Sequence, residues 1–368
     1  SGSVKGDLFY AACRKHSSAL DASLYGDNIP TAVYDTVIDT VTKNLAPLHE
    51  YMELRRKVLG VPELHMYDIA APLVKESKEE IPYDRAVETV TEGLRVLGDE
   101  YVSVLKSGFS SRWIDIYENK GKRKGAYSWG SYGTHPYVLL NYNGKYDDVS
   151  TLSHELGHTM HSYLANKAQP FALSHYSIFV AEVASTFNES LLLEHMLETE
   201  TRDEVRLSLL GNYLDNARAT VFRQVQFAEF EWKIHATAEE GTALTGDLLH
   251  SMYSAITREY FGHDKGICIV DDDIQAEWTY IPHFYYNFSV YQYATSFTAS
   301  TSILERALAG EKDIIGKYLS LLAAGGSDYP IELLKRVGVD MTTSQPLDAT
   351  MARMNRIMDE IEQIARRL

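Results

Sequence analysis

Apolar residues recur at helical spacing along most of this chain. Residues 36–59 repeat them every three or four positions, with Pro47 marking a break or kink. Residues 83–98 form a second such segment, which closes on a glycine. The pattern is mostly helical again from residue 148 to residue 368. The sequence therefore predicts a mainly α protein.

One short stretch has a different character. In residues 126–142, AYSWGSYGTHPYVLLNY, β-branched and aromatic residues stand among glycines, which indicates one or two strands and a turn. We find no internal repeat and no low-complexity segment. We therefore expect one large helical body over residues 1–368 with a small β element. Within it, residues 1–110 would form a helical scaffold portion and residues 111–368 would carry the functional site.

The predicted helix after these strands carries two histidines four positions apart, His154 and His158, in the sequence HELGH. Asp148 is expected to cap this helix, and its apolar stripe consists of Val149, Leu152, Leu156, Met160 and Tyr163. Both histidines lie on roughly the opposite face, close enough together to share one metal ion. Glu155 is angularly offset, so its carboxylate reaches a metal-bound water rather than the metal. The alternative is a surface helix whose histidines bond only to water or carboxylates.

A third metal ligand is expected from another helix. His161 is excluded because it lies about 10.5 Å from His154 along the helix axis, too far for both to bind one ion. In residues 179–189, Glu182 stands on the face opposite the apolar residues. An acidic residue in an otherwise apolar helix costs free energy unless it is paired, and a metal would supply the pairing. A solvated glutamate would give the same pattern, but beside the HELGH motif we predict Glu182 as the third ligand.

Composition narrows the possible functions. With 51 acidic and 35 basic residues, a formal net charge of −16, we expect no nucleic-acid partner. The basic run at residues 120–124 is short and is interpreted as a solvated loop. No apolar run is long enough to span a bilayer and no secretory signal is recognisable, so we expect no membrane association. Two isolated cysteines, Cys13 and Cys268, fit a reducing, cytoplasmic location.

Two groups of motifs resemble a known family. HELGHTMH followed by FVAEVASTFNE is similar to the thimet-oligopeptidase-like zinc metallopeptidases, and GKRKGAYSWGSYGTHPYVLLNY and IPHFYYNFSVYQYATSF resemble its oligoendopeptidase F branch. The resemblance covers most of residues 7–368. It implies a helical zincin-type catalytic body with a small sheet next to the motif helix, one Zn²⁺ ion and oligopeptide substrates. Family members are longer at the N-terminus, so the chain resembles their C-terminal catalytic part, with the N-terminal region of the same protein as an expected partner.

The resemblance also implies roles for individual residues. It makes His154, His158 and Glu182 the zinc ligands and Glu155 the catalytic base, the same four residues that the spacing selects. It places a histidine and a tyrosine of the late aromatic segment at the oxyanion of the reaction. Matched residue by residue, these are His283 and Tyr291, with Tyr286 as a substitute. The same segment holds other phenol donors, Tyr280, Tyr285 and Tyr293.

Residues near the predicted strands are candidates for substrate binding. An extended peptide could pair with an edge strand at residues 136–141, through main-chain hydrogen bonds that ignore side-chain identity. Gly130 and Gly133 would then permit close approach of the backbone, or they serve only tight turns. His135 is a substrate contact by resemblance. Glu189, seven residues after Glu182, is a candidate for orienting a ligating histidine.

Two other functions are compatible with parts of the pattern. A zinc carboxypeptidase can share the HExxH-plus-Glu core, but it would need a basic residue to hold the terminal carboxylate of its substrate. A catalytically silent helical scaffold could retain a vestigial metal site. The intact Glu155 argues against the scaffold, because binding alone needs no general base. A zinc-dependent endopeptidase that hydrolyses short peptides is therefore the leading hypothesis.

Overall fold

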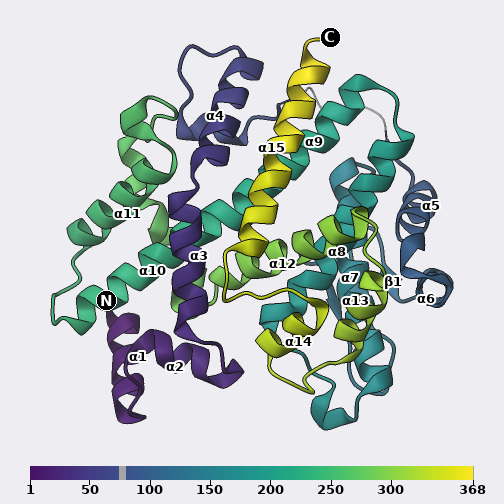
Figure 1. Ribbon diagram of the computed structural model, residues 1–368, viewed down its shortest axis with the longest axis horizontal. Helices are drawn as coiled ribbons and strands as arrows, with labels where there is room; N and C mark the ends of the chain where they lie inside the picture. Colours follow the sequence, from purple (N-terminus) through teal and green to yellow (C-terminus); the bar gives the residue numbers. More distant parts are fainter. Residues whose placement is uncertain (74–79, 368) are drawn as a thin grey trace. The chain divides into compact units, whose positions relative to one another are not determined.

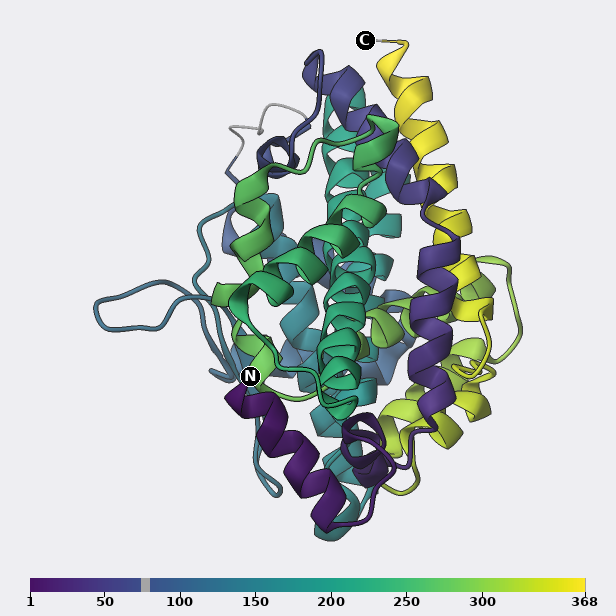
Figure 2. The ribbon, with the colours of Figure 1, turned by 90° about the vertical axis from the view of Figure 1, so that its left-hand side faces the viewer.

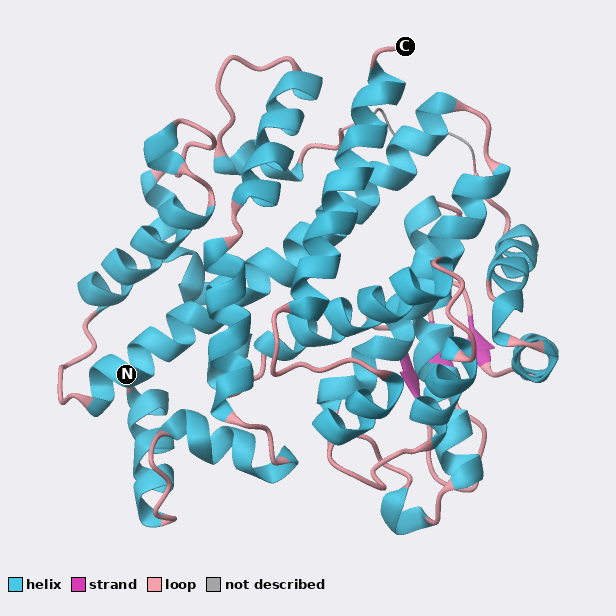
Figure 3. Cartoon of the chain, in the orientation of Figure 1, coloured by secondary structure: helices cyan, strands magenta, loops and turns pink. Residues whose placement is uncertain are grey.

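The computed structural model describes residues 1–73 and 80–367, and helices make up most of them (Figure 1). Strands form only one small three-stranded sheet in the described part of the chain (Figure 3). This confirms the predicted mainly α class with a small β element. None of the described helices combines the length and the apolar character that crossing a bilayer requires.

The described residues fold into two compact units, each assembled from separate stretches of chain. Unit 1 takes those of Ser1–Glu76, Leu210–Thr295 and Met341–Leu368. Unit 2 takes those of Ser77–Leu209 and Ser296–Asp340. The predicted division into a scaffold portion at residues 1–110 and a functional portion at residues 111–368 stays a prediction.

Unit 1 is built from helices. They are α1 (Gly2–Cys13), α2 (Ala19–Leu24), α3 (Thr31–Lys43), α4 (Ala46–Leu59), α10 (Arg223–Glu239), α11 (Gly246–Tyr260) and α15 (Gln345–Ala365). α15 lies beside α3 and α4, as both views show (Figures 1 and 2). Pro47 stands in the first turn of α4, where no backbone N–H is needed, so the predicted break between the two helices is confirmed. The helices α9 (Asp203–Ala217) and α12 (Tyr291–Leu308) contain residues of both units.

Unit 2 combines helices with the sheet. Its elements are α5 (Tyr83–Gly93), α6 (Asp99–Ser110), β1 (Ile114–Asp115), β2 (Tyr127–Trp129), β3 (Tyr137–Leu139), α7 (Tyr146–Ala168), α8 (Ile178–Thr199), α13 (Ile314–Ala323) and α14 (Pro330–Val337). α5 is shorter than the predicted helix over residues 83–98. After it, Arg95–Leu97 tighten into a 3₁₀ turn and Gly98 adopts a φ of 95°, which stops the helix.

The order of strands in the sheet is β1-β3-β2. β3 pairs in parallel with β1 and antiparallel with β2. The expectation that residues 136–141 form an edge strand was therefore wrong, because both sides of β3 are already paired. The edge strand next to α7 is β2, and the Ser128 and Thr159 hydroxyls are 2.8 Å apart between these two elements.

α7 and α8 pack against each other and form the core of unit 2 around the HELGH motif. Their predicted apolar faces are buried: Val149, Leu152, Leu156 and Met160 on α7, and Val180, Val183, Phe187 and Leu191 on α8. The two helices cross at Gly157. A Cβ atom there would lie 2.5 Å from the Ala184 carbonyl oxygen and 2.6 Å from the Ser185 Cα atom. Only a glycine permits this approach.

The start of α7 differs from the prediction by a few residues. Asp148 lies inside the first turn instead of capping the helix from outside. Its Oδ2 atom accepts hydrogen bonds from the backbone N–H groups of Asn143 at 3.0 Å and Lys145 at 2.9 Å. The carboxylate therefore fixes the chain that leads into α7 and opposes the helix dipole at its N-terminus.

Candidate metal centre

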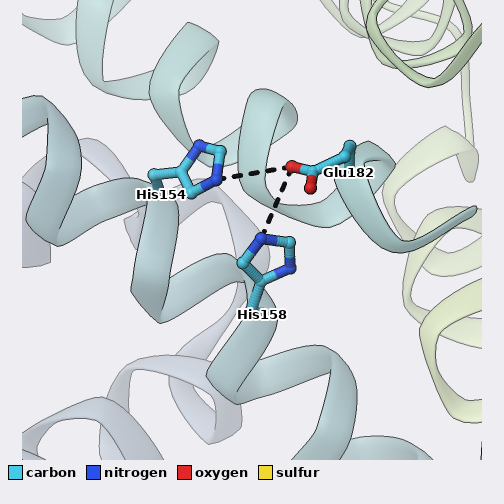
Figure 4. A group of neighbouring side chains, drawn as sticks. All are labelled: His154, His158 and Glu182. Atoms are coloured by element: carbon cyan, nitrogen blue, oxygen red, sulfur yellow. Dashed lines mark ion pairs between the residues drawn. The ribbon is translucent and has the colours of Figure 1, made fainter. Parts of the chain in front are cut away.

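Three side chains from α7 and α8 converge on one point (Figure 4). The Oε2 atom of Glu182 lies 3.4 Å from the Nε2 atom of His154 and 3.4 Å from the Nε2 atom of His158. Each of the three offers one ligand atom, and these atoms all lie within 4.8 Å of one another. The structure thus brings together the three residues that were predicted as metal ligands.

The two distances from Glu182 Oε2 to the histidine nitrogens fit zinc. Ligand atoms about 2.0–2.1 Å from a tetrahedral zinc ion lie about 3.3–3.4 Å from one another. Two imidazole nitrogens and one carboxylate oxygen are also one of the donor sets of catalytic zinc sites, which leave the fourth position for water or substrate. All three side chains are partly exposed, so a fourth ligand can reach the site.

Neighbouring side chains hold the ligands in place. Glu189, also on α8, places its Oε2 atom 3.3 Å from the Nδ1 atom of His154, and the Ser150 hydroxyl donates to its Oε1 atom at 3.2 Å. A carboxylate at Nδ1 directs Nε2 of the same ring toward a metal. The Ser185 hydroxyl donates to Oε2 of Glu182 at 2.8 Å. The sequence pointed to Glu189, but nothing in it singled out the two serines.

The charges at the centre are strongly coupled. Burial raises the pKa of Glu182, but hydrogen bonds and charge interactions with His154 and His158 outweigh it, so the pKa lies well below its usual value. Burial lowers the pKa of His154, but Glu189 and Glu182 outweigh it, so that pKa lies well above its usual value. Without a cation, the two glutamates therefore favour a proton on His154. A divalent cation would satisfy the same negative charge.

Glu155 lies on α7 between the two histidines and is 6% exposed. Burial raises the pKa of its carboxyl, which the charges of His154 and His158 partly oppose. Its Oε2 atom is buried and has no hydrogen-bond partner among the described residues. An unpaired buried carboxylate oxygen is costly unless a ligand or water completes it. Glu155 is therefore available to act on a molecule bound next to the three ligand atoms.

His161 takes no part in the centre. Its ring is buried and stacks on Tyr176 with 3.5 Å between ring centroids. Burial, with a contribution from His158, lowers the pKa of His161 to about 3, so the ring is neutral. This agrees with its exclusion as a ligand by helix geometry.

The residues expected at the oxyanion belong to unit 1. His283 lies in a 3₁₀ turn, Pro282–Tyr285, and its ring centroid is 6.3 Å from that of Tyr286 and 6.2 Å from that of Tyr293. Tyr291 is only 1% exposed and packs on Tyr34 at 5.0 Å between centroids. The structure thus places Tyr286 and Tyr293 next to His283 and buries Tyr291 in the core of unit 1.

The candidate substrate contacts lie in unit 2. The His135 ring stacks on Trp113 at 4.8 Å, and its Nδ1 atom lies 2.8 Å from the Pro136 carbonyl oxygen. Gly133 has a φ of 83° and open space around it, so the turn itself requires a glycine there. At Gly130 a Cβ atom would lie 3.2 Å from the Cα atom of Pro136, which reflects close approach of two backbones. Roles for His135 and Gly133 in substrate binding stay predictions.

Comparisons with known proteins agree with these features. The profile of Peptidase family M3 matches residues 3–353. The chain is 46% identical over 364 residues to oligopeptidase PepF of Bacillus subtilis, covering 99% of this chain and 54% of that protein. It is 43% identical to an oligoendopeptidase F homolog of Lactococcus lactis, covering 98% and 59%. The chain thus spans little more than half the length of these relatives.

Solved structures give the same result. The crystal structure of oligoendopeptidase F from Enterococcus faecium has a TM-score of 0.78 at 37% identity, covering 99% of this chain and 58% of that one. A crystal structure from Chlamydophila abortus has a TM-score of 0.91 at 42% identity, covering 99% and 60%. Both similarities cover 99% of this chain, including the HELGH motif.

Proposed function

The chain belongs to peptidase family M3, and on this premise we propose that it is the catalytic part of a zinc-dependent endopeptidase acting on short peptides. The observation that carries the proposal is that Glu182 Oε2 lies 3.4 Å from Nε2 of both His154 and His158, with the unpaired Oε2 atom of Glu155 on the helix of the two histidines. One Zn²⁺ ion would be the cofactor. Peptide substrates and a contribution from an N-terminal region of the same protein are parts of the same proposal.

His154, His158 and Glu182 would hold the zinc ion, which when bound polarises a carbonyl and lowers the pKa of a coordinated water. Glu155 accepts the proton of the attacking water and then delivers it to the leaving amine. Its raised pKa, caused by burial, suits a group that must both take and return a proton near neutral pH. Glu189 keeps the His154 ring oriented through its Nδ1 atom.

The peptide is proposed to lie extended along β2. This strand is next to α7 and pairs with β3 on one side only in the described part of the chain. Main-chain hydrogen bonds to its outer side would bind peptides with little regard for their side chains. The exposed rings of Tyr127 and Trp129 would contact side chains of the substrate.

Tyr293, together with His283, is the better candidate for donating a hydrogen bond to the oxyanion. The resemblance suggested Tyr291, but its phenol is buried, whereas Tyr293 is 37% exposed next to His283. We expect Tyr293→Phe to lower kcat by about 10²-fold, the loss typical of removing one oxyanion donor. Tyr291→Phe should mainly affect thermal stability. Equal kcat losses in the two variants, measured on one quenched peptide, would contradict this assignment.

Zinc content and peptide cleavage together test the proposed function. Elemental analysis of the purified chain should give one zinc per molecule, and a quenched internal peptide should be cleaved until a chelator removes the metal. Amidation of the C-terminus of the substrate should leave turnover intact, whereas it would abolish cleavage by a carboxypeptidase. A chain that binds zinc but cleaves no peptide would favour the silent scaffold.

A cytoplasmic location also remains a proposal. Cys13 and Cys268 are both free thiols, the first exposed and the second buried. Unpaired cysteines are ordinary in a reducing compartment and less so in an oxidising one. Fractionation of cells that produce the protein would test this.

A further inference from the structure

The loop between His283 and α12 contains two residues with unusual backbone conformations. Asn287 has a φ of 40° and Phe288 a φ of 51°. Residues with a Cβ atom rarely adopt positive φ, and two in succession are costly. Such a conformation persists only where surrounding contacts hold it.

Two polar contacts hold the backbone of this turn. Glu231, a fully buried residue of α10, accepts a hydrogen bond from the Phe288 N–H at 2.6 Å through its Oε1 atom. The Ser23 hydroxyl donates to the Asn287 carbonyl oxygen at 3.0 Å. The Oε2 atom of Glu231 is buried and has no hydrogen-bond partner among the described residues. The hydrogen bond from the Phe288 amide is thus the polar contact of this carboxyl.

Aromatic packing fixes both ends of the loop on α10. Phe288 is buried, and its ring lies 4.5 Å from that of His235 and 5.6 Å from that of Tyr34. At the other end, Phe284 lies 5.3 Å from Phe230 and 5.4 Å from Phe227.

Tyr286, between these two anchors, is 66% exposed, and its ring lies 6.3 Å from that of His283. The loop therefore presents Tyr286 outward between the half-buried Phe284 and the buried Phe288.

The charge state of Glu231 is compatible with this role. The pKa of its carboxyl is raised to about 8, mainly by burial and also by Asp7 of α1, while the hydrogen bond from the Phe288 amide opposes the shift. His235, whose Nδ1 atom lies 2.8 Å from the backbone carbonyl oxygen of Glu231, and Tyr34 of α3 are further titratable groups beside it. At neutral pH the carboxyl is mostly uncharged, so it needs no counter-ion and still accepts the hydrogen bond.

We propose that Glu231 is a positioning residue for the reaction: its buried carboxyl holds the turn at residues 286–288 and so places His283 and Tyr286 for the peptide. The inference rests on the proposed function. It assigns a task to a buried acid that lies outside the candidate metal centre and is not itself a catalytic residue.

Hydrogen exchange at the Phe288 amide and steady-state kinetics together test the inference. Glu231→Leu removes the acceptor, and we expect exchange at this amide to rise by about tenfold or more and kcat to fall by at least about tenfold, with zinc content unchanged. Glu231→Gln keeps a carbonyl acceptor and should retain most of the protection and turnover. Glu229→Leu is the matched control, because Glu229 is buried on the same helix but bonds to Lys233 at 2.6 Å. It should leave both readouts close to wild type.

Either of two results would overturn the inference. One is wild-type protection of the Phe288 amide in Glu231→Leu, and the other is lost protection with unchanged kcat. If the leucine variant does not fold, Glu231→Asp takes its place, since it withdraws the oxygen from the amide without adding an apolar group. A folded aspartate variant with wild-type exchange and kcat would equally overturn it. A wild-type chain without peptidase activity would instead refute the proposed function. Hydrogen exchange at the Phe288 amide would still show whether the Glu231 carboxyl anchors the turn.

The same carboxyl predicts a pH dependence of stability. Its pKa of about 8 in the folded chain lies above the value of about 4.3 expected when unfolded. The folded state therefore keeps a proton that the unfolded chain loses, and stability should fall as pH rises from about 4.5 to about 8. Urea midpoints at pH 5 and pH 8 should differ more in the wild type than in Glu231→Gln. An identical difference in both would show that the carboxyl is not buried as a neutral acid.

Discussion

Glu155→Gln is expected to keep its zinc and to lose at least about 10²-fold in turnover. Glutamine has nearly the same size and shape, so the three ligand atoms on α7 and α8 should stay where they are. It cannot accept a proton, however, and general-base catalysis contributes about 10²–10⁴-fold. The buried and unpaired Oε2 atom of Glu155 is the atom that would carry out the proton transfer.

Metal analysis and steady-state kinetics on one quenched peptide check this expectation. Glu100→Gln is a suitable control, since Glu100 makes an exposed ion pair with Lys167 at 2.6 Å. Exposed ion pairs contribute little to stability, so Glu100→Gln should bind zinc and turn over the peptide like the wild type. Full activity in a zinc-loaded Glu155→Gln would refute the mechanism, whereas loss of zinc would show that Glu155 supports the site in another way.

Gly157→Ala is expected to damage the metal centre without changing any ligand. The added Cβ atom would lie 2.5–2.6 Å from backbone atoms of Ala184 and Ser185, which cannot turn aside as a side chain can. Relief requires α7 and α8 to move apart, and overpacking of this kind costs about 1–3 kcal/mol. Because Glu182 lies on α8 and both histidines lie on α7, the movement separates the ligand atoms. We expect zinc affinity to fall by about 10-fold to 100-fold, the range found when a residue that orients a metal ligand is lost.

Zinc titration against a competing chelator measures this change, and thermal unfolding of the zinc-free chain measures the packing cost separately. Gly211→Ala serves as the control, because a Cβ atom there meets Leu73 at an ordinary 3.4 Å. Alanine is the better helix former, so this variant should be neutral or slightly stabilising. Unchanged zinc affinity in Gly157→Ala would mean that the helix crossing does not set the ligand geometry.

The sequence predicted those parts of the site that depend on the spacing of residues within one helix. Two histidines four positions apart share a helix face wherever that helix lies, and Glu182 was conspicuous because the residues directly before and after it in α8 are apolar. The ligand triad follows from these two signals, and the structure places its atoms within 4.8 Å of one another.

The parts that the sequence did not predict depend on partners far along the chain. Tyr291 is buried because Tyr34 packs on it, and no local pattern distinguishes it from Tyr293. β3 is a middle strand because the two-residue strand β1 pairs with it, and two residues are too few to show strand periodicity. The hydrogen-bond partner of Glu231, the Phe288 amide, lies 57 residues away in the sequence, so no local pattern marks this glutamate.

The chain order of the elements has a consequence for how the molecule matures. The helices α7 and α8, which carry the three predicted ligands, follow each other directly and are joined only by residues 169–177, so bringing these side chains together closes only a short loop. The turn that follows His283 depends instead on Ser23, Tyr34 and Glu231, which all lie far from it along the chain. Contacts of such high sequence separation are slow to form, because closing a long loop costs conformational entropy. On this argument, the three side chains of α7 and α8 come together before the turn at residues 286–288 is held in place.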